Sequence, residues 1–579
     1  MINDILKDST TPYSLYADDV AIWYSDSDLQ KCCEHIQLTL NNLQKWANDW
    51  GFTFSAAKSK AIFFTKKRLP DYPLTLNSET IHIVPSFKFL GLHFDKNLIW
   101  KNHITETKTK CTSDLNLLKI VAAQKWGADF TTLRQLYISL TLSKITYASF
   151  LYDTASPTNL KILDRLQYSA ARIILGSLRC TKVQNLEYVS NLLPLSQFRK
   201  LQLSKYTCSI LSVQGNPLRR LILDYYPFPH YSFFKYPLPI CGRILEEFKK
   251  SNIMLKNIGS SPISSKYLTH SNLALSTLHT CPKDDLTPAQ WRCQFNNLIQ
   301  EYRGHYTIYT DGSVCGTKSG CGAWASDFSL KARLPDNFSI FSCELYAIYV
   351  SIMYSLKSTL PILILTDSLS AVFALKNPHN SKHHLIEKIT SQILKLPPNK
   401  ITIQWIPSHT DIPGNDKADT LAKESLNLSY ITQAQYSTRD AHKILNKIYS
   451  DKHYDLWYHL NESSPSFIHL KRSNAPYPFL LLPRPTQVAL TRLHLLVCRL
   501  THQHYFTKEA PYTCPHCTNQ ISLEHVFIIC PYLNNARQTL IRECSKQKIS
   551  LQLPNILDGK FPLQPLLKFL HDTNTLEKL

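Results

Sequence analysis

Glycine, cysteine and long apolar runs are all scarce in this 579-residue sequence, and each scarcity narrows the class of protein. Only 14 glycines accompany 32 prolines, which predicts stiff rather than flexible connections between folded parts. The 16 cysteines are under 3% of the residues, so we expect a reducing compartment, with a few cysteines reserved for metal. No run of 18 apolar residues occurs, and the start, MINDILKDST, lacks the basic and apolar regions of a signal peptide.

Acidic residues are also in deficit. The 64 Lys and Arg outnumber the 43 Asp and Glu and leave a net charge of +21, which favours a polyanionic partner. Because no membrane-spanning run is present, we expect nucleic acid rather than a membrane surface. The apolar content of 44% is ordinary for a globular protein, and this length predicts roughly three to five domains.

Hydrophobic periodicity indicates a multidomain α/β protein. Residues 36–50 show helical spacing and stop at Gly51, and the runs FTFSAAKSKAIFF and PSFKFLGLHFD after them are typical of strands. A compact pattern of strand, strand, helix, strand, helix, strand, helix begins at 305 and ends near 428. The predicted parts are 1–98, strand-rich after one helix; 99–213, helical and basic; 214–300, a Pro-rich connector with little regular structure, including YYPFPHYSFFKYPLP; 301–430, the compact α/β part; and 431–579, helical with a Cys/His cluster at 514–530.

Four acids of the compact α/β part stand beside buried runs, where an isolated carboxylate is costly. They are Asp311 at the end of the strand HYTIYTDGS, Glu344 on the apolar helix FSCELYAIYVSIMYSL, Asp367 at the end of the strand PILILTDS, and Asp419 at the edge of the apolar face of the helix GNDKADTLAKESL. Singly, each is better explained as an ordinary surface acid or as part of a turn or helix cap. Together they predict a cluster that shares Mg²⁺ or Mn²⁺, because oxygen ligands suit hard cations. His409, on a loop before Asp419, is placed to move protons or assist product release, although solvation explains a single loop histidine equally well.

The pieces YTDGS, CELYAI, LTDS and WIPSH followed by GNDKAD occur in the order of the type 1 ribonuclease H family, which residues 305–428 therefore resemble. The resemblance implies a mixed five-stranded sheet with helices, and cleavage of the RNA strand of an RNA–DNA hybrid. It also implies that the four acids bind metal and that His409 is the mobile-loop histidine. Two ions about 3.5–4 Å apart would polarise the scissile phosphate and activate water. Since residues 301–430 hold 12 Lys and Arg against 11 Asp and Glu, we expect their flanks to supply phosphate affinity.

The N-terminal run LYADDVAIW predicts a tight hairpin with Asp18 and Asp19 at its tip. It resembles the catalytic hairpin of reverse transcriptases. LQKWANDWGFTFSAAKSKAIFF, with Lys58, and SFKFLGLHFD resemble the next palm motifs, and the basic helical part resembles the thumb and connection of a non-LTR retrotransposon polymerase. In that family a third metal-binding acid and the fingers precede the hairpin by many tens of residues, whereas fifteen residues precede Tyr16 here. We therefore expect the C-terminal part of a retrotransposon polyprotein, truncated or a partial gene model, with a vestigial polymerase site and no polymerase activity by itself.

The run CPHCTNQISLEHVFIIC has the spacing of a closed four-ligand Zn²⁺ site. The expected ligands are Cys514, Cys517, His525 and Cys530, with His516 as a less favoured substitute. A chance or redox CxxC pair would not need the trailing His and Cys. With RLHLLVCRLTHQHYF before it, the run resembles the zinc knuckle that follows the ribonuclease domain in some non-LTR retrotransposons, which implies contact with nucleic acid. Cations expected to contact phosphate are Arg484, Arg492, Arg499 and Lys508.

These predictions describe an RNA–DNA hybrid endoribonuclease within a retrotransposon-derived protein. Its expected partners are hybrid, RNA and DNA, and its expected ions are Mg²⁺ or Mn²⁺ at the acids and Zn²⁺ at the knuckle. Two alternatives stay open: a catalytically silent nucleic-acid-binding remnant, and an RNA-directed DNA polymerase active only in a full-length context. We expect an intracellular location, nuclear or cytoplasmic, with the nucleus implied by the family alone.

Overall fold

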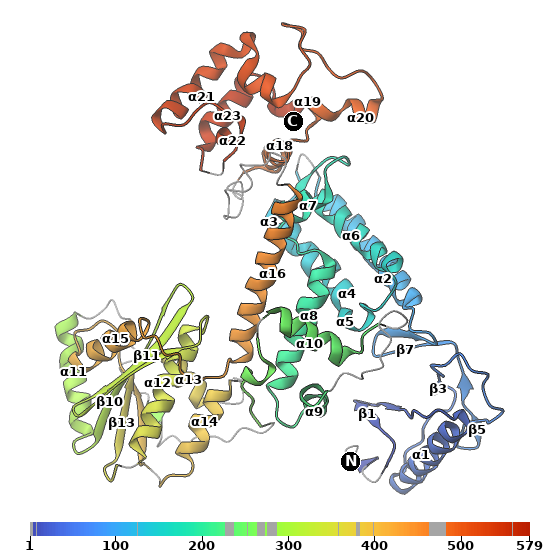
Figure 1. Ribbon diagram of the computed structural model, residues 1–579, viewed down its shortest axis with the longest axis vertical. Coiled ribbons are helices and arrows are strands. Elements are labelled where there is room, and N and C mark those ends of the chain that lie inside the picture. The colour runs from blue at the N-terminus through green and yellow to red at the C-terminus, as the bar shows by residue number, and fades with distance from the viewer. Residues whose placement is uncertain are drawn as a thin grey trace. The chain divides into compact units, whose positions relative to one another are not determined.

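The chain is seen in a computed structural model in which two compact units are distinguished (Figure 1). The structure describes residues 4–6, 9–123, 126–225, 237–251, 253–262, 273–274, 287–356, 358–377, 383–397, 399–461, 482–558 and 560–579. One unit comprises 1–195 with 463–579, and the other comprises 196–462. The five predicted domain ranges stay predictions. Most of the aromatic run YYPFPHYSFFKYPLP, at 226–236, lies outside the described residues.

The first unit begins with the expected tight hairpin. Strands β1 (Tyr13–Tyr16) and β2 (Asp19–Ile22) pair antiparallel, with Tyr16 opposite Asp19. Helix α1 (Leu29–Trp50) starts earlier than its periodic stretch, because the Asp28 side chain caps it, and it ends at Gly51 with φ of 71°. The short strands that follow are β3 (Lys60–Ala61), β4 (Thr75–Leu76), β5 (Glu79–Thr80), β6 (His82–Ile83), β7 (Ser86–Phe89) and β8 (Leu92–Asp95). The run FTFSAAKSKAIFF, expected to be rich in strand, holds strand only at Lys60–Ala61.

The rest of the first unit is helical. Its first series is α2 (Lys101–Val121), α3 (Phe130–Leu136), the π-helix η2 (Tyr137–Leu142), α4 (Ser143–Thr146), α5 (Ser149–Tyr152), α6 (Pro157–Leu175) and α7 (Val183–Val189). Its second series is α18 (Arg484–His494), α19 (Arg499–His502), α20 (His504–Thr507), η9 (His525–Ile529), η10 (Pro531–Leu533), α21 (Asn534–Lys546), α22 (Leu553–Ile556), α23 (Leu563–Asp572) and η11 (Leu576–Lys578). The two series meet where α18 packs against α6.

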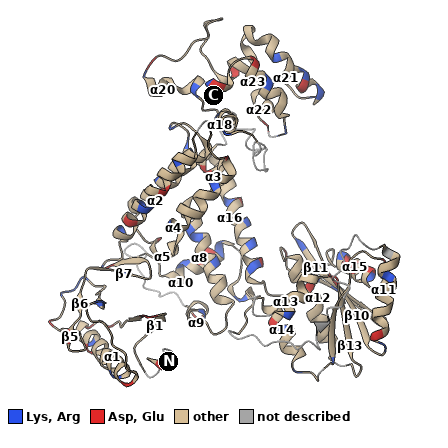
Figure 2. Cartoon of the chain, turned by 180° about the vertical axis from the view of Figure 1, so that it is seen from behind, with Lys and Arg blue, Asp and Glu red and all other residues tan. Residues whose placement is uncertain are grey.

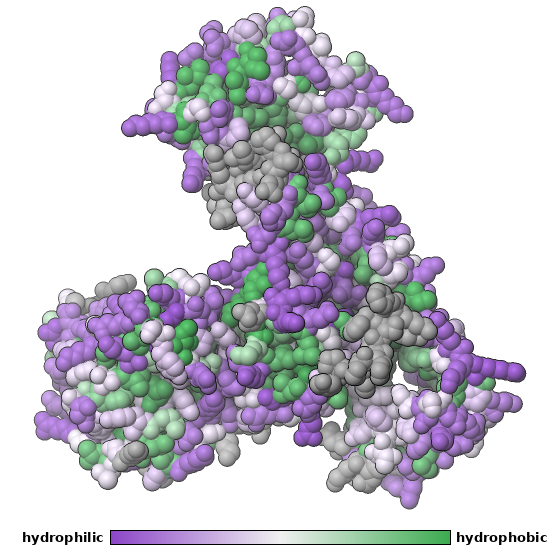
Figure 3. Space-filling model, in the orientation of Figure 1, coloured by the Kyte–Doolittle hydropathy of each residue, from purple (hydrophilic) through white to green (hydrophobic). Residues whose placement is uncertain are grey.

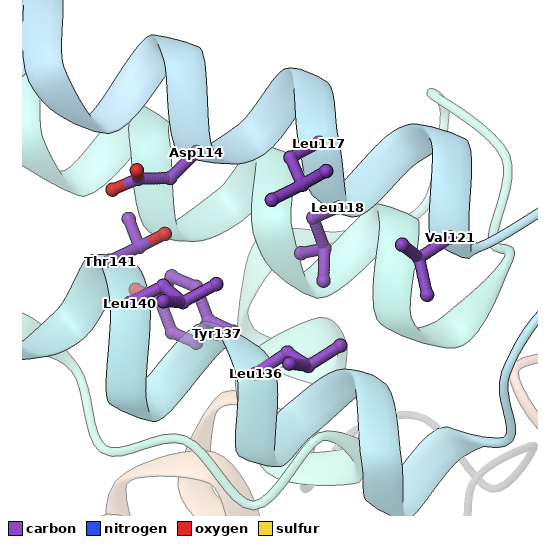
Figure 4. Close-up of a pocket in the computed structure, with 8 residues that line it drawn as sticks. All are labelled: Asp114, Leu117, Leu118, Val121, Leu136, Tyr137, Leu140 and Thr141. Carbon is purple, nitrogen blue, oxygen red and sulfur yellow. The ribbon is translucent and has the colours of Figure 1, made fainter.

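A small pocket opens between α2 and the α3–η2 segment (Figure 4). Leucine and valine side chains dominate its lining, and Asp114 at its edge is paired with Lys144 at 2.8 Å. Because that carboxylate is already neutralised, the pocket has the character of a packing gap between helices rather than of a metal or phosphate site.

The second unit contains several helices outside its sheet. They are α8 (Leu195–Leu211), α9 (Pro217–Leu223), α10 (Ile240–Ser251), the 3₁₀ turn η3 (Leu255–Asn257), α11 (Pro288–Glu301) and α16 (Thr438–Leu460). Of these, α9, α10, η3 and α11 lie where a connector was expected. The expectation of little regular structure over 214–300 is therefore wrong in its described parts. Helix α11 starts at a capping box formed by Thr287 and Gln290, with Pro288 in its first turn.

A mixed sheet organises the second unit, in the strand order β12-β11-β10-β13-β14-β9. The strands are β10 (Tyr306–Cys315), β11 (Lys318–Ala325), β12 (Phe328–Leu334), β13 (Ile362–Thr366), β14 (Ile401–Trp405) and the two-residue β9 (Leu273–Ala274). β10, β11 and β12 form an antiparallel meander, whereas β10, β13 and β14 run parallel. The five strands β10–β14 agree with the sheet implied by the ribonuclease H resemblance, and β12 corrects the four-strand pattern read from periodicity.

Helices cover both faces of this sheet (Figure 1). On one face pack α12 (Ile340–Ser355), α13 (Leu369–Lys376) and α14 (His384–Ile393), two helices lying between β13 and β14 where one was expected. On the other face Phe295 of α11 packs on Leu363 and Leu365 of β13. Helix α15 (Pro413–Ser425) lies against β11, where a Cβ at Gly322 would come 2.5 Å from the carbonyl oxygen of Ala418. This close packing fixes α15 beside the strands that carry the acids.

Candidate active site

Asp311 lies where two neighbouring parallel strands separate. β10 pairs with β13 only as far as Thr310 and Thr366, whereas its pairing with β11 continues to Cys315. Asp311 is therefore inside β10, which corrects the expectation that it ends the strand. Asp367 is the first residue after β13, so both carboxylates stand just beyond the last parallel pair.

Glu344 is brought to the same place by α12. The helix is capped by the Ser339 side chain, which accepts from the backbone N–H of Ser342. It crosses β10 at Gly312 so closely that a Cβ there would lie 2.9 Å from the backbone nitrogen of Glu344. Glycine at this position is thus required by the approach of the helix to the strand.

The carboxylates of Asp311, Glu344 and Asp367 offer oxygens that all lie within 4.8 Å of one another. Asp311 and Glu344 are each only 6% exposed. Burial, followed by the charges of Asp367 and Asp419, raises the pKa of Asp311 to about 8. Burial and the charge of Asp311 likewise raise the pKa of Glu344 well above its ordinary value.

This donor set fits a divalent cation. Two buried acids and the half-buried Asp367 repel one another, and Glu344 Oε2 has no hydrogen-bond partner among the described residues. An orphaned buried carboxylate oxygen is costly unless a cation meets it. The all-oxygen set matches the preference of Mg²⁺ or Mn²⁺.

Asp419 and His409 lie at the margin of this three-acid cluster. Asp419, half-buried on α15, forms an ion pair with Lys423 at 2.7 Å, and its charge contributes to the raised pKa of Asp311. His409 is exposed with φ of 54°, and its charge lowers the pKa of Asp367 against the larger effect of burial. The structure thus brings three of the predicted acids into one group and places the other two candidates beside it.

Two neighbours of Asp367 were not foreseen from the sequence. Burial raises the pKa of Asp367, and a hydrogen bond from the buried Asn415 side chain is the first effect that opposes it. Trp405 Nε1 donates to the Asp367 carbonyl oxygen at 3.1 Å and so fixes the backbone after β13. Asn415 lies in the run GNDKAD, where the acids gave the pattern that predicted a metal site.

The cysteine cluster assembles as the spacing predicts. Cys514, Cys517, His525 and Cys530 offer ligand atoms within 4.8 Å of one another. Cys514 Sγ lies 3.9 Å from Cys530 Sγ, and Cys517 Sγ lies 3.3 Å from His525 Nε2. A hydrogen bond from the backbone of His516, and then one from His525, lower the pKa of Cys514 to about 6. A thiolate-rich set with one imidazole is consistent with Zn²⁺.

The His516 side chain has another partner. Its ring stacks on Tyr532 with centroids 3.5 Å apart and an interplanar angle of 8°. His516 is not part of the four-residue cluster.

Two of the four cations expected to contact phosphate are buried instead. Arg484 donates to the carbonyl oxygens of Ile174 and Ile173 at 2.7 and 2.8 Å. Arg492 donates to those of Gly176 and Leu579 at 2.7 and 3.1 Å. The phosphate interpretation is wrong for both, because their guanidinium groups bind main-chain carbonyls, whereas Arg499 and Lys508 are exposed.

The hairpin acids are placed differently from the three clustered acids. Asp18, Asp19 and Lys58 are exposed, and Ala17 in the turn has φ of 52°. Among the described residues, neither Asp18 nor Asp19 belongs to a group of three or more metal-ligating side chains. Their assignment to a vestigial polymerase site stays a prediction.

Comparison with known proteins adds a family to this geometry. The sequence model of the RNase H family matches residues 303–427, which hold the sheet, the three acids, Asp419 and His409. These residues form an RNase H domain, and the chain is distantly related to reverse transcriptases of non-LTR retrotransposons.

Three curated relatives carry that relationship. The chain is 24% identical over 163 residues to an RNA-directed DNA polymerase from mobile element jockey of Drosophila funebris. It is 21% identical over 161 residues to a probable RNA-directed DNA polymerase from transposon X-element, and 25% identical over 161 residues to one from transposon BS, both of Drosophila melanogaster. Each match covers 28% of this chain and 18% of the relative.

Two solved structures overlap a similar share of the chain. A foamy viral protease-reverse transcriptase in complex with dsDNA matches at 21% identity with a TM-score of 0.20, covering 22% of this chain and 96% of that one. The solution structure of a PFV RNase H domain matches at 21% identity with a TM-score of 0.19, covering 21% and 96%.

The described helices include none that is both long and apolar enough to cross a membrane. Figure 3 shows hydrophilic and hydrophobic residues mixed over the visible face of the described parts.

Proposed function

We propose that this protein hydrolyses the RNA strand of RNA–DNA hybrids endonucleolytically, as part of a non-LTR retrotransposon protein. The observation that carries the proposal is the meeting of Asp311, Glu344 and Asp367 in an RNase H domain, with Glu344 Oε2 lacking a hydrogen-bond partner among the described residues. A buried group of like charges serves no packing purpose, and it suits divalent cations that face a phosphate.

Asp311, Glu344 and Asp367 would hold the ions, with Asp419 at the open side of the site. Bound Mg²⁺ or Mn²⁺ would supply Lewis-acid polarisation of the phosphate and a water of lowered pKa. The ionised carboxylates offer only hydrogen-bond acceptors, so they would orient the hydrogens of that water. His409, exposed beside Asp367, is placed to accept or return a proton during departure of the product.

Cations outside the RNase H domain support binding of the hybrid. Residues 301–430 are close to neutral, with 12 basic and 11 acidic residues. Helix α16 carries Arg439, Lys443 and Lys447, exposed and spaced by four residues on one side (Figure 2). Such a row of positive charge suits the phosphate backbone and predicts strongly salt-dependent affinity.

The Cys/His cluster is proposed to hold Zn²⁺ and to order the surrounding helices, with Arg499 and Lys508 available to phosphate. We further propose that this chain does not polymerise DNA unaided, because Asp18 and Asp19 are exposed outside any described group of three ligands. Extension of a primer by the purified chain would contradict this second point.

The decisive experiment is cleavage of a hybrid whose RNA strand carries an end label, in Mg²⁺ and in chelator. Asp367→Asn is the active-site variant, and Asp416→Asn, an exposed acid of α15, is the matched control. We expect wild type and Asp416→Asn to cut the RNA strand only with metal, and Asp367→Asn to lose at least 100-fold. Because all variants are purified identically, loss of cleavage in Asp367→Asn alone excludes a contaminating nuclease. If the wild-type protein binds the hybrid but does not cut it, the protein is a nucleic-acid-binding remnant without activity.

A further inference from the structure

A buried polar network joins α16 to the helix that carries Glu344. Asp440 Oδ1 accepts from the backbone N–H of Ser339 at 3.0 Å, and its Oδ2 accepts from the Ser342 hydroxyl at 2.5 Å. Oδ2 also accepts from the Ser437 hydroxyl at 2.7 Å. Asp440 is 1% exposed and Ser342 is fully buried. One carboxylate thus closes the N-terminal turn of α12 and that of α16 together.

His383 completes the network on its other side. Its Nε2 lies 3.0 Å from Ser342 Oγ, and its Nδ1 accepts from the backbone N–H of Leu385 at 3.3 Å. Because the Ser342 hydroxyl donates to Asp440, its oxygen accepts from His383 Nε2–H, which fixes the tautomer. Burial lowers the pKa of His383 to about 4, so the ring is neutral at pH 7.

The network lies at the first turn of α12, the helix that positions Glu344. Asp440 places negative charge at the N-terminus of the 16-residue helix α12, where the helix dipole favours it. Ser342 and Glu344 belong to neighbouring turns of the same helix. On its inner side α12 is already in contact with β10 at Gly312, so anchoring its first turn leaves Glu344 little freedom relative to Asp311.

Asp440 lies outside residues 303–427, which match the RNase H family. We propose that Asp440 is a positioning residue of the metal site, acting through Ser339 and Ser342 to hold Glu344 against Asp311. The inference rests on the proposed function. It means that α16, through Asp440, helps to position the acids of the site. The helix is itself anchored farther along, where Tyr449 donates to Glu247 of α10 at 2.7 Å.

The test compares Asp440→Asn, which keeps the shape of the side chain but replaces an acceptor by a donor, with Ser342→Ala, which removes the hydroxyl that links Asp440 to His383. Asp451→Asn, an exposed acid of the same helix, is the matched control. Mn²⁺ affinity is measured by calorimetry and by electron paramagnetic resonance on the intact chain, with Asp367→Asn defining binding at the acids. The Mg²⁺ concentration for half-maximal cleavage and the melting temperature are measured in parallel.

We expect Asp440→Asn and Ser342→Ala to weaken Mn²⁺ affinity and raise the half-maximal Mg²⁺ concentration about tenfold, as for residues that orient metal ligands. Excess Mg²⁺ should restore cleavage, and Asp451→Asn should match wild type. A loss of folded protein alone would lower the melting temperature and the amplitude of cleavage but would not shift the half-maximal Mg²⁺ concentration.

Unchanged Mn²⁺ affinity in a folded Asp440→Asn variant would overturn the inference, as would absence of Mn²⁺ binding in wild type. If the wild-type protein binds Mn²⁺ at the acids but does not cut hybrid, only the proposed function is contradicted. In that case a tenfold weaker Mn²⁺ affinity in Asp440→Asn still supports the positioning role.

Discussion

The backbone nitrogen of Glu344 lies so near Gly312 that no side chain fits between them: a Cβ at residue 312 would come within 2.9 Å of that nitrogen. It would also come within 2.9 Å of Cys343 Cβ. One glycine on the central strand thus sets how near the helix that carries Glu344 approaches Asp311.

Gly312→Ala should therefore push α12 away from β10 and separate Glu344 from Asp311. We expect a loss of roughly 1–3 kcal/mol in the free energy of unfolding, typical of overpacking. We also expect at least tenfold weaker Mn²⁺ binding. Denaturant unfolding and calorimetry measure the two effects on the same preparation.

Gly316→Asn is the matched control for this change. Gly316 has φ of 61° with no atom within 4 Å of a Cβ, and asparagine tolerates that conformation better than most residues. It should leave metal affinity unchanged. Equal metal affinity in Gly312→Ala and Gly316→Asn would show that the contact does not position Glu344.

The cluster of Asp311, Glu344 and Asp367 should make the metal-free protein less stable as the pH rises. The pKa of Asp311 is raised from 3.8 to about 8, so between these values the folded state holds a proton that the unfolded state has lost. Stability then falls with increasing pH through that window. Mg²⁺ should oppose the fall by binding the ionised carboxylates.

Melting temperatures at pH 6.5 and 8, in chelator and in Mg²⁺, test this sign. Buried histidines such as His383, with its pKa of about 4, are already neutral in the folded state, whereas in the unfolded state they still release protons just above pH 6.5, so they make stability rise with pH. The Cys514 thiol, with its pKa lowered to about 6, acts in the same direction. Both effects oppose that of Asp311, so the difference between wild type and Asp311→Asn is the quantity to compare. Equal pH dependence in these two proteins would contradict the prediction.

The acids were predictable because each follows a local pattern, such as a single charge on an apolar helix or an acid after a buried strand. The edge strand β12 was missed although Phe328 and Leu330 alternate with the exposed Ser329 and Lys331, which is the pattern of a half-buried strand. The role of Asp440 was invisible because its partner Ser342 is 98 residues away. Arg484 was misread for the same reason, since sequence gives its charge but not the carbonyl opposite it.

His525→Ala should abolish stoichiometric zinc binding, whereas His516→Ala should retain it. His525 Nε2 lies 3.3 Å from Cys517 Sγ, while the His516 ring stacks on Tyr532. We expect one zinc per chain in wild type and in His516→Ala, measured by mass spectrometry of the metal content. Loss of zinc in His516→Ala with retention in His525→Ala would make His516 the ligand.

Zinc removal should also loosen the core that Val526 and Phe527, next to His525, help to form. We expect faster amide exchange over 514–570 after chelation, without change in the strands β10–β14. Equal exchange with and without zinc would mean that the cluster does not support this core.

Arg484→Ala and Arg499→Ala should change different properties of the protein, although both arginines are expected from the sequence to contact phosphate. Arg484 is buried and binds the carbonyls of Ile173 and Ile174, so its loss should cost about 2–4 kcal/mol of stability. Hybrid affinity of the folded fraction should not change. Arg499 is exposed, so its loss should spare the melting temperature and reduce by about one the slope of log affinity against log salt concentration. If Arg484→Ala reduces that slope in fully folded protein, then its guanidinium group contacts phosphate and the carbonyl bonds are not its main role.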